Sequence, residues 1–337
     1  MSTTRTITAF APGRVNLIGD HTDYAGGLAL PMAIDLGTTI RGRAIDEPVV
    51  RMRSADQPGP AEVPIDVGDP TTVAPDWARY VAGVVAELHP ARGFDGDVTT
   101  TIPIGSGLSS SAALELAVAL VLGFDGPRQA LARLGQRAEQ RASGVPCGLM
   151  DQLASAVGVE DHALLMDFRT GSVEPVPLPS GVDVVVVHSG QHRALATSAY
   201  ADRRAACEQA AAIVGPLRDV TLDAIAAIDD PVVRRRARHV LTENQRVREF
   251  AAALAANDLA TAGRLMVESH ASLRDEFEVS TPALDALVDR LVATPGVHGA
   301  RLTGAGFGGC VVALTDPGVL DEGWTVRPSG GARLLDH

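Results

Sequence analysis

The segment Ala11-Pro-Gly-Arg-Val-Asn-Leu-Ile-Gly-Asp-His-Thr-Asp-Tyr24 is the most informative stretch of this chain. It crowds charged and hydrogen-bonding side chains around glycines and a proline, although a folding core has little use for so many polar groups. A hydroxyl-rich small molecule does use them, because each sugar hydroxyl needs a donor or acceptor placed for it. The segment therefore predicts a sugar-binding loop. A polar loop whose Asp and His side chains cap neighbouring turns is the alternative.

A second segment, Thr101-Ile-Pro-Ile-Gly-Ser-Gly-Leu-Ser-Ser-Ser-Ala-Ala-Leu-Glu115, has the features of a phosphate-binding loop. A strand-like alternation precedes it, and an unbroken Ala/Leu/Val run typical of a buried helix follows. Gly105 and Gly107 permit a tight turn and close approach of a ligand. The serines from Ser109 to Ser111 then lie at a helix N-terminus, where free N–H groups and the helix dipole attract anions. Helix capping is the alternative, for which one serine would suffice.

A third segment, Arg301-Leu-Thr-Gly-Ala-Gly-Phe-Gly-Gly-Cys310, is again rich in glycine and leads into the strand-like residues 311–314. Its glycines indicate backbone conformations or close approaches that a side chain would block. A glycine-rich hairpin would look similar, so this segment is informative only together with the other two.

Composition narrows the class of protein. The 337 residues, of which 46% are hydrophobic, suffice for one large or two medium domains. No segment approaches twenty uninterrupted apolar residues, and the first residues lack the apolar run of a signal peptide. Cys147, Cys207 and Cys310 are scattered, which favours reduced thiols over a disulfide framework or a zinc site. The net charge of −12 disfavours nucleic-acid and anionic-membrane partners, and we expect a cytoplasmic protein.

The chain contains no lysine, so all 29 residues counted as Lys or Arg are arginine. A Walker P-loop requires a lysine after its glycines, and that class of nucleotide site is therefore excluded. Schiff-base and lysine-nucleophile chemistry are excluded for the same reason.

The hydrophobic pattern predicts a mixture of strands and helices. Strands and turns dominate from Ile7 to Arg53, residues 55–75 read as a surface excursion, and the β-branched run Val182–His188 predicts a buried strand. Helices are predicted over residues 76–88, 112–123, 129–142, 199–214, 231–255, 259–274 and 282–294. A Pro/Ser/Gly stretch interrupts the pattern near residue 178, which predicts two domains, 1–178 and 179–337.

Together the three segments resemble the three motifs of the GHMP small-molecule kinases, and residues 11–24 resemble the signature of the galactokinase family within them. The resemblance runs from about residue 9 to residue 315. It is supported along the chain by Asp76–Gly83, Cys147–Gln152, Ser198–Arg204, Arg238–Asn244 and Glu268–Asp275. The resemblance implies an α+β fold, with an N-terminal domain like ribosomal protein S5 domain 2, a ferredoxin-like C-terminal domain, and an active site in their cleft.

The same resemblance implies ATP and Mg²⁺ as cofactors. The residues implied in the phosphate cradle are Gly105, Ser106, Gly107, Leu108, Ser109, Ser110 and Ser111. Trp77 is implied beside the adenine, although core packing explains a tryptophan in a helix equally well. Ser111 and Glu139 would hold Mg²⁺. From the sequence pattern alone, Glu139 also fits a solvated position beside neighbouring arginines.

Asp151 is the candidate catalytic carboxylate. It lies in a mostly apolar segment, where an unpaired charge would be costly, so a partner cation is expected. The resemblance implies that this partner is Arg14. We interpret Asp151 as the group that orients the acceptor hydroxyl and takes its proton late, and Arg14 as stabilising the developing phosphoryl charge. Full deprotonation by Asp151 before attack is the alternative.

The resemblance also implies the groups that meet the sugar, and these are Asp20, His21, Thr22, Asp23, Gly148 and Tyr200. Asp20 departs from the family, which usually has glutamate before this histidine. The contact near the sugar's 6-hydroxyl is then expected to be weakened or lost. Only nine residues separate Leu314 from Trp324, where galactokinases typically carry another helix, so a trimmed edge is expected.

The function that follows is ATP-dependent phosphorylation of the C1 hydroxyl of galactose by a monomer or weak homodimer. The alternatives are a kinase of N-acetylgalactosamine, arabinose or fucose, and a galactose/ATP sensor without catalysis. A dinucleotide site is a further alternative, because Gly105-x-Gly107 follows a predicted strand. Ser110 stands where the third glycine of that motif is needed, which argues against it.

Overall fold

The computed structural model describes residues 5–103, 105–191 and 196–335, with the side chains of 196–198 left aside. Strands and helices alternate in its first half: β1 Ile7–Asn16, β2 Leu28–Ala29, β3 Pro31–Ile45, β4 Val49–Ser54, β5 Ala61–Pro64, α1 Ala78–Leu88, β6 Gly93–Thr100, α2 Ser110–Val121, α3 Arg128–Ser143, α4 Met150–Val157, β7 His162–Asp167 and β8 Val173–Pro177. Helices dominate the second half: β9 Asp183–His188, α5 Ala196–Val214, α6 Leu222–Ala226, α7 Pro231–Ala255, α8 Leu259–Asp275, α9 Pro282–Val292, β10 Val297–Leu302, β11 Cys310–Thr315, β12 Trp324–Val326 and β13 Arg333–Leu334.

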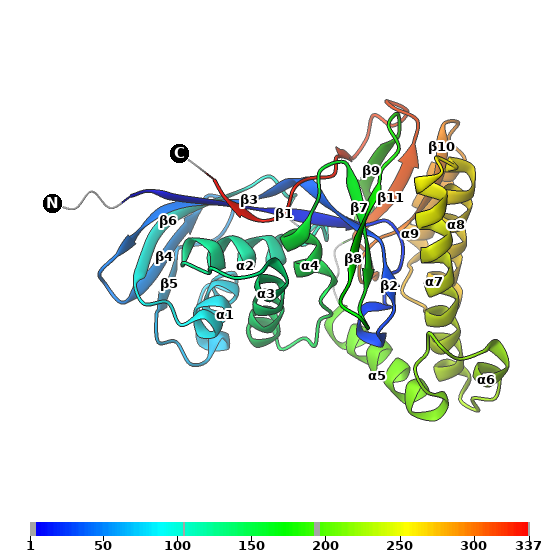
Figure 1. The fold of residues 1–337 in the computed structure, drawn as a ribbon, viewed down its shortest axis with the longest axis horizontal. Coiled ribbons are helices and arrows are strands. Elements are labelled where there is room, and N and C mark those ends of the chain that lie inside the picture. Colours follow the sequence, from blue (N-terminus) through cyan, green and yellow to red (C-terminus); the bar gives the residue numbers. More distant parts are fainter. Residues whose placement is uncertain (1–4, 104, 192–195, 336–337) are drawn as a thin grey trace.

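A six-stranded sheet in the order β13-β1-β3-β6-β4-β5 forms one layer, and α1 to α4 cover one of its faces (Figure 1). The helices bury their Ala, Leu and Val side chains against that face, because the alternating strands turn their apolar positions toward it. The phosphate segment opens α2, residue 139 lies on α3 and residue 151 begins α4. Three neighbouring helices therefore carry the predicted catalytic and nucleotide groups under the end of β1.

The second half is built on a four-stranded antiparallel sheet, β10-β11-β9-β12. The long helices α7 and α8 lie side by side next to it, at the end of the molecule away from β4 and β5 (Figure 1). Their N-termini are set by sequence signals, since Asp230 accepts the N–H groups of Val232 and Val233 and Asp258 accepts that of Thr261. A smaller sheet, β2-β7-β8, lies between the two halves.

One of the two buried hydrophobic clusters spans both halves of the chain, whereas the other, around Phe277 and Leu291, lies within the second half. Phe250 of α7 and Leu265 of α8 belong to the same buried cluster as Leu17, Leu30 and the residues of α2. The end of the chain also returns to the first sheet, because β13 pairs with β1 and Ile34 bridges to Pro328. The predicted line at residue 178 thus does not separate two independent cores, and residues from about 327 onward pack with the N-terminal sheet.

Each predicted helix is found to within a few residues at each end, and the mixed α+β class is confirmed. The short helices α4 and α6 were not predicted. Residues 55–75 differ, because Ala61–Pro64 form a strand, β5, that extends the sheet edge beside β4. No helix occurs among residues 316–323, which the structure describes in full, so the edge after β11 is trimmed as expected.

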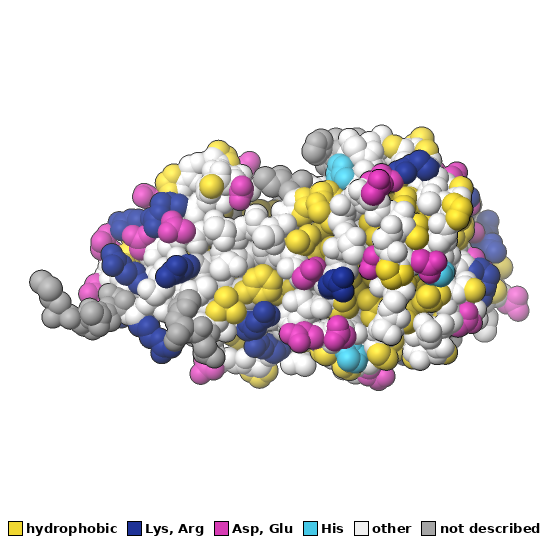
Figure 2. All heavy atoms as spheres, turned by 90° about the horizontal axis from the view of Figure 1, so that it is seen from above, with side chains coloured by type: hydrophobic (Ala, Val, Ile, Leu, Met, Phe, Trp, Pro, Cys, Tyr) yellow, Lys and Arg dark blue, Asp and Glu magenta, His cyan; other side chains and the backbone are white. Residues whose placement is uncertain are grey.

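The surface over the six-stranded sheet carries positive and negative side chains beside one another (Figure 2). Arg53, for example, lies 2.7 Å from a carboxylate oxygen of Asp95 and 2.9 Å from one of Asp97. Among the helices that the structure describes, none is long and apolar enough to cross a membrane.

Candidate active site

The serines of the phosphate segment do not cap α2. Ser109 takes the N-cap position with a left-handed backbone, φ 62° and ψ 49°, and its side chain makes no capping bond. Its hydroxyl instead donates to Asp151 Oδ2 over 2.5 Å. Ser110 is exposed at the first turn of the helix. The capping alternative is therefore wrong, and the N-terminal N–H groups of α2 face a cavity that also holds the serine hydroxyls.

Ser111 and Glu139 lie together, although 28 positions separate them in the sequence. The Ser111 hydroxyl donates to Glu139 Oε1 over 3.0 Å, and Gln152 holds the other carboxylate oxygen through its amide. Burial, followed by the charge of Asp151, raises the pKa of Glu139 above its ordinary value. A hydroxyl and a carboxylate are hard oxygen ligands, and Mg²⁺ usually completes such a pair with water and phosphate oxygens. The two side chains thus fit a magnesium site of the predicted kind.

Arg14 and Asp151 form a bidentate pair. Nε of Arg14 donates to Oδ1 over 2.9 Å and Nη2 donates to Oδ2 over 2.8 Å. The remaining amino group, Nη1, donates to the carbonyl of Gly107 over 2.8 Å. The Arg14 side chain is 5% exposed and that of Asp151 is 31% exposed, so the carboxylate is the more accessible member of the pair. This geometry fixes one edge of Asp151 and leaves an acceptor for a substrate hydroxyl.

Close contact between β1 and the phosphate segment brings Arg14 into position. The backbone N–H of Arg14 donates to the carbonyl of Leu108 over 3.1 Å, at a point where the β1–β3 register shifts. A Cβ on Gly13 would lie 2.5 Å from the same carbonyl, so only glycine permits this approach. The conformation of the first motif is therefore coupled to that of the second.

Two cavities meet at this pair. One, of about 560 Å³, is lined by the phosphate segment, Trp77 and the strands β3 and β6. The other, of about 420 Å³, is lined by residues of the first motif, by Gly148 and Tyr200, and by the third motif. Both cavities are lined by Arg14, Tyr80, Glu139 and Asp151. The arrangement can hold two ligands on either side of one carboxylate and one guanidinium.

The second cavity draws its polar groups from both halves of the chain. Asp23 lies against Gly148, where a Cβ would come within 1.5 Å of Asp23 Oδ2. Burial, together with the charge of Asp151, raises the pKa of Asp23 to about 6. Burial likewise raises the pKa of Tyr200 well above its ordinary value, so Tyr200 keeps its proton. These groups present a carboxylate and a phenol to the cavity.

His21 adopts a left-handed backbone, φ 63°, in the turn that enters this cavity. Its Nε2 lies 3.2 Å from the carbonyl of Ala305 and its Nδ1 lies 2.9 Å from the hydroxyl of Tyr24. The carbonyl requires a proton on Nε2, so the tyrosine hydroxyl donates to Nδ1. Burial lowers the pKa of His21 to about 3, and the imidazole is therefore neutral at physiological pH.

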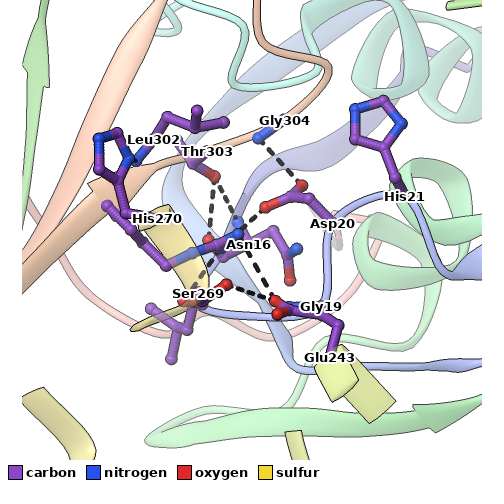
Figure 3. A network of polar contacts seen from close by, with 12 residues as sticks. Asn16, Gly19, Asp20, His21, Glu243, Ser269, His270, Leu302, Thr303 and Gly304 are labelled. Atoms are coloured by element: carbon purple, nitrogen blue, oxygen red, sulfur yellow. Dashed lines mark hydrogen bonds and ion pairs between the residues drawn. The ribbon is translucent and has the colours of Figure 1, made fainter. Parts of the chain in front are cut away.

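Asp20 lines the cavity, yet the protein already uses both of its carboxylate oxygens (Figure 3). Oδ1 accepts the backbone N–H of Gly304 over 3.0 Å, and Oδ2 lies 2.8 Å from Nη1 of the buried Arg301. Burial raises the pKa of Asp20 while the charge of Arg301 opposes the rise. The carboxylate thus joins the first motif to the third, a role that the sequence did not indicate.

Three predicted site residues lie outside the linings of the two cavities. The Thr22 hydroxyl is buried and donates to the backbone carbonyls of Gly19 and Leu28, over 2.9 and 2.6 Å, so it serves the turn and does not line the cavity. Ser106 and Leu108 are buried residues of the phosphate segment, and their side chains do not line the nucleotide-side cavity. Leu108 contributes its carbonyl to β1 instead. The remaining predicted site residues line one or both cavities.

Sequence reasoning missed Gln152 and Glu115. The Gln152 amide donates both to Glu139 and, over 3.1 Å, to Glu115, and both Gln152 and Glu115 are fully buried. Burial, then the charge of Glu139, raises the pKa of Glu115 well above its ordinary value. A glutamate in the Ala/Leu/Val run of α2 was the available signal, because an ionisable residue on a buried helix is rarely there for packing.

The fold and the site define a GHMP kinase. The model of the GHMP kinases N terminal domain matches residues 78–159, and that of the GHMP kinases C terminal matches residues 250–324. A mevalonate kinase from Methanococcus jannaschii is similar in fold, with a TM-score of 0.68, 20% identity and 99% of each chain covered. A homoserine kinase from Cytophaga hutchinsonii has a TM-score of 0.60 and 18% identity, again with 99% of each chain covered.

Within that class the assignment is narrower. The galactokinase galactose-binding signature matches residues 2–44. The galactokinase of Lactococcus lactis, whose crystal structure contains galactose, is 33% identical to this chain, with a TM-score of 0.90. The match covers 99% of this chain and 96% of that one. The chain belongs to the galactokinase family, and it is a sugar kinase.

Proposed function

We propose that this protein transfers the γ-phosphoryl group of ATP to the C1 hydroxyl of galactose, giving galactose 1-phosphate and ADP. The junction of the two cavities at Arg14 and Asp151 carries the proposal. A triphosphate held by Gly105, Gly107 and the serines would end on one side of the pair, and a sugar held by the first motif would begin on the other. The galactose-binding signature over residues 2–44 supports galactose as that sugar.

The chemistry follows from what these side chains offer. Asp151 accepts the proton of the C1 hydroxyl as its oxygen bonds to the γ-phosphorus, and the bond from phosphorus to the bridging oxygen breaks to release ADP. Such a transfer has a loose transition state, so orientation and charge contribute more than a strong base. Arg14 holds the carboxylate and sets positive charge beside the transferred group. Mg²⁺, held by Ser111 and Glu139, would supply charge against the phosphate oxygens.

The environment of Asp20 also bears on how the protein recognises the 6-hydroxyl of the sugar. Oδ1 of Asp20 accepts the Gly304 N–H, Oδ2 is ion-paired with Arg301, and the side chain is only 2% exposed, so the carboxylate is poorly available to a 6-hydroxyl. We therefore propose weak discrimination between galactose and 6-deoxygalactose. A site that depends on a hydrogen bond to that hydroxyl would reject the deoxy sugar strongly, because its own buried acceptor would be left unpaired.

The proposal includes a cytoplasmic protein that acts alone or as a weak homodimer, with the sugar and ATP as partners. The thiols of Cys147 and Cys207 are free, which suits a reducing compartment. A galactose/ATP sensor without turnover would keep the two cavities but has no need for the Asp151–Arg14 pair between them.

The test is sugar-dependent ADP release with D-galactose, 6-deoxy-D-galactose, 2-deoxy-D-galactose, N-acetyl-D-galactosamine, L-arabinose and L-fucose at fixed MgATP. We expect the highest kcat/KM with galactose and a loss of less than about tenfold with 6-deoxygalactose, the factor that corresponds to 1.4 kcal/mol. Preference for another sugar would overturn the acceptor, and binding without ADP release would support the sensor. A loss above a hundredfold with 6-deoxygalactose would overturn only the statement about C6.

A further inference from the structure

A buried polar network joins Asp20, which lines the sugar-side cavity, to Glu243 of α7 (Figure 3). Its charged members are Asp20, Glu243 and Arg301, none of whose side chains is more than 2% exposed. The guanidinium of Arg301 lies between the two carboxylates, 2.8 Å from Asp20 and 3.9 Å from Glu243. Arg246, at the surface end, donates to Glu243 over 2.7 Å and completes the charge balance.

Side chains of the network contact the turn that carries Asp20 through three hydrogen bonds to backbone groups and one ion pair. Two come from α7: Glu243 accepts the backbone N–H of Gly19 over 3.0 Å, and His239 Nε2 lies 3.2 Å from the carbonyl of Asp20. Two come from the third motif: Arg301 donates to the carbonyl of Leu17 over 3.2 Å and pairs with the Asp20 carboxylate. The sugar-binding turn is therefore held by side chains that do not themselves line the cavity.

Glu243 is the central member. Its Oε1 accepts both the Gly19 N–H and the hydroxyl of Ser269, which comes from α8. Burial alone would raise the pKa of Glu243, but Arg246 and the charges beyond it lower that pKa to about 2. A carboxylate that remains ionised at this depth is costly unless its neighbours hold it, so its retention needs a reason other than packing.

We propose that Glu243 is a positioning residue for the sugar, which acts with Arg301 to hold the Gly19–Asp20 turn and, through it, to set the affinity for the acceptor. The proposal rests on the sugar-kinase function given above. His21 is held through the same segment. Its Nε2 donates a hydrogen bond to the carbonyl of Ala305, and the preceding residue, Gly304, donates its backbone N–H to Asp20. Loosening the turn would therefore move two cavity-lining groups together, while the nucleotide side stays as it is.

The test is a double-mutant cycle on galactose KM with Glu243→Gln, Asp20→Asn and the combined variant. The glutamine keeps an oxygen for the Gly19 N–H, loses the charge, and replaces the oxygen that accepts from Arg246 with an NH2 group. We expect galactose KM to rise roughly tenfold in each single variant, as for one hydrogen bond to a charged group, with kcat and ATP KM within about twofold of wild type. If Glu243 acts through the turn, the combined variant should be no worse than the poorer single one.

Glu249→Gln is the matched control, because Glu249 is an exposed glutamate on the same helix whose carboxylate accepts a hydrogen bond from its neighbour Gln245. Ser269→Ala provides a milder change that removes one donor from Glu243, and it should raise galactose KM by roughly two- to fivefold. If Glu243→Gln does not fold, the galactose KM of Ser269→Ala tests the positioning role of Glu243.

Multiplying effects in the combined variant, an unchanged galactose KM in Glu243→Gln, or an equal rise in ATP KM would each overturn the proposal. The sugar preference of the wild-type enzyme distinguishes failure of the positioning proposal from failure of the proposed function. If wild type prefers another sugar of the panel, the same ratios are measured with that sugar. If wild type binds no sugar at all, both the function and the positioning role are contradicted.

Discussion

At the scale of single residues, the Asp151 carboxylate accepts three hydrogen bonds from the protein and remains partly exposed to the cavities. Arg14 supplies two of them and Ser109 the third, so the carboxylate is rigidly held before any substrate arrives. We expect Asp151→Asn to lower kcat by roughly 10²–10⁴-fold, the usual contribution of a general acid or base, with galactose affinity nearly unchanged. Steady-state kinetics and calorimetry measure the two quantities. Asp125→Asn, at an exposed loop position, is the control, and wild-type kcat in Asp151→Asn would remove Asp151 from the mechanism.

Asp23 gives a pH dependence with a definite sign. Its pKa of about 6 means that the free enzyme binds a proton there as pH falls through 6, while His21, with a pKa of about 3, stays neutral. Sugar hydroxyls donate to the ionised carboxylate and so lower its pKa, and galactose binding should therefore release protons, with a maximum between the pKa of the bound enzyme and the free value of about 6. Calorimetry in buffers of different ionisation enthalpy measures the release. Asp23→Asn should abolish it, and proton uptake by wild type near pH 6 would contradict this account of Asp23.

At the scale of elements, the approach of β1 to the phosphate segment is the feature most sensitive to one methyl group. A Cβ on Gly13 would meet the Leu108 carbonyl at 2.5 Å and Ile102 at 3.0 Å, and a backbone carbonyl has little freedom to move. We expect Gly13→Ala to destabilise the fold by about 1–3 kcal/mol and to lower kcat by shifting Arg14. Gly68→Ala, where a Cβ meets nothing within 4 Å, is the control for denaturant unfolding and activity. Equal stability of the two variants would show that the contact is not tight.

The sequence predicted the features that depend on neighbouring residues and missed those that depend on contacts between distant segments. Local signals predicted the phosphate segment and the helices, because glycine spacing, caps and apolar periodicity act over a few residues. The resemblance supplied Arg14 as the partner of Asp151. The contacts of Asp20 with Gly304 and Arg301 join segments 281 or more positions apart, and no local pattern encodes such a pairing. The role of the Thr22 hydroxyl was missed for the same reason, since it serves a turn whose geometry emerges only in the folded chain.

At the scale of the whole molecule, the last residues close the fold. Leu335 donates to the carbonyl of Thr8 and Ala332 to that of Ser155, both over 2.8 Å, while Arg333 lies over the ring of Phe10. Deletion of residues 327–337 should lower the unfolding temperature by about 5 °C or more, since several backbone hydrogen bonds of about 1 kcal/mol each are lost. Calorimetry should still give one transition, because one buried cluster spans both halves. Deletion of 336–337 is the control, and an unchanged unfolding temperature in the longer deletion would contradict the closing role.

The central claim is that the Asp151–Arg14 pair joins a nucleotide cavity to a galactose cavity for transfer to C1. The most direct test is ³¹P and ¹³C NMR of the product formed by the wild-type enzyme from MgATP and galactose labelled with ¹³C at C1. We predict one phosphorylated sugar whose phosphorus couples to the labelled carbon, formed in step with ADP and missing with Asp151→Asn. Phosphate on another carbon, or ADP and inorganic phosphate without a sugar phosphate, would contradict the claim.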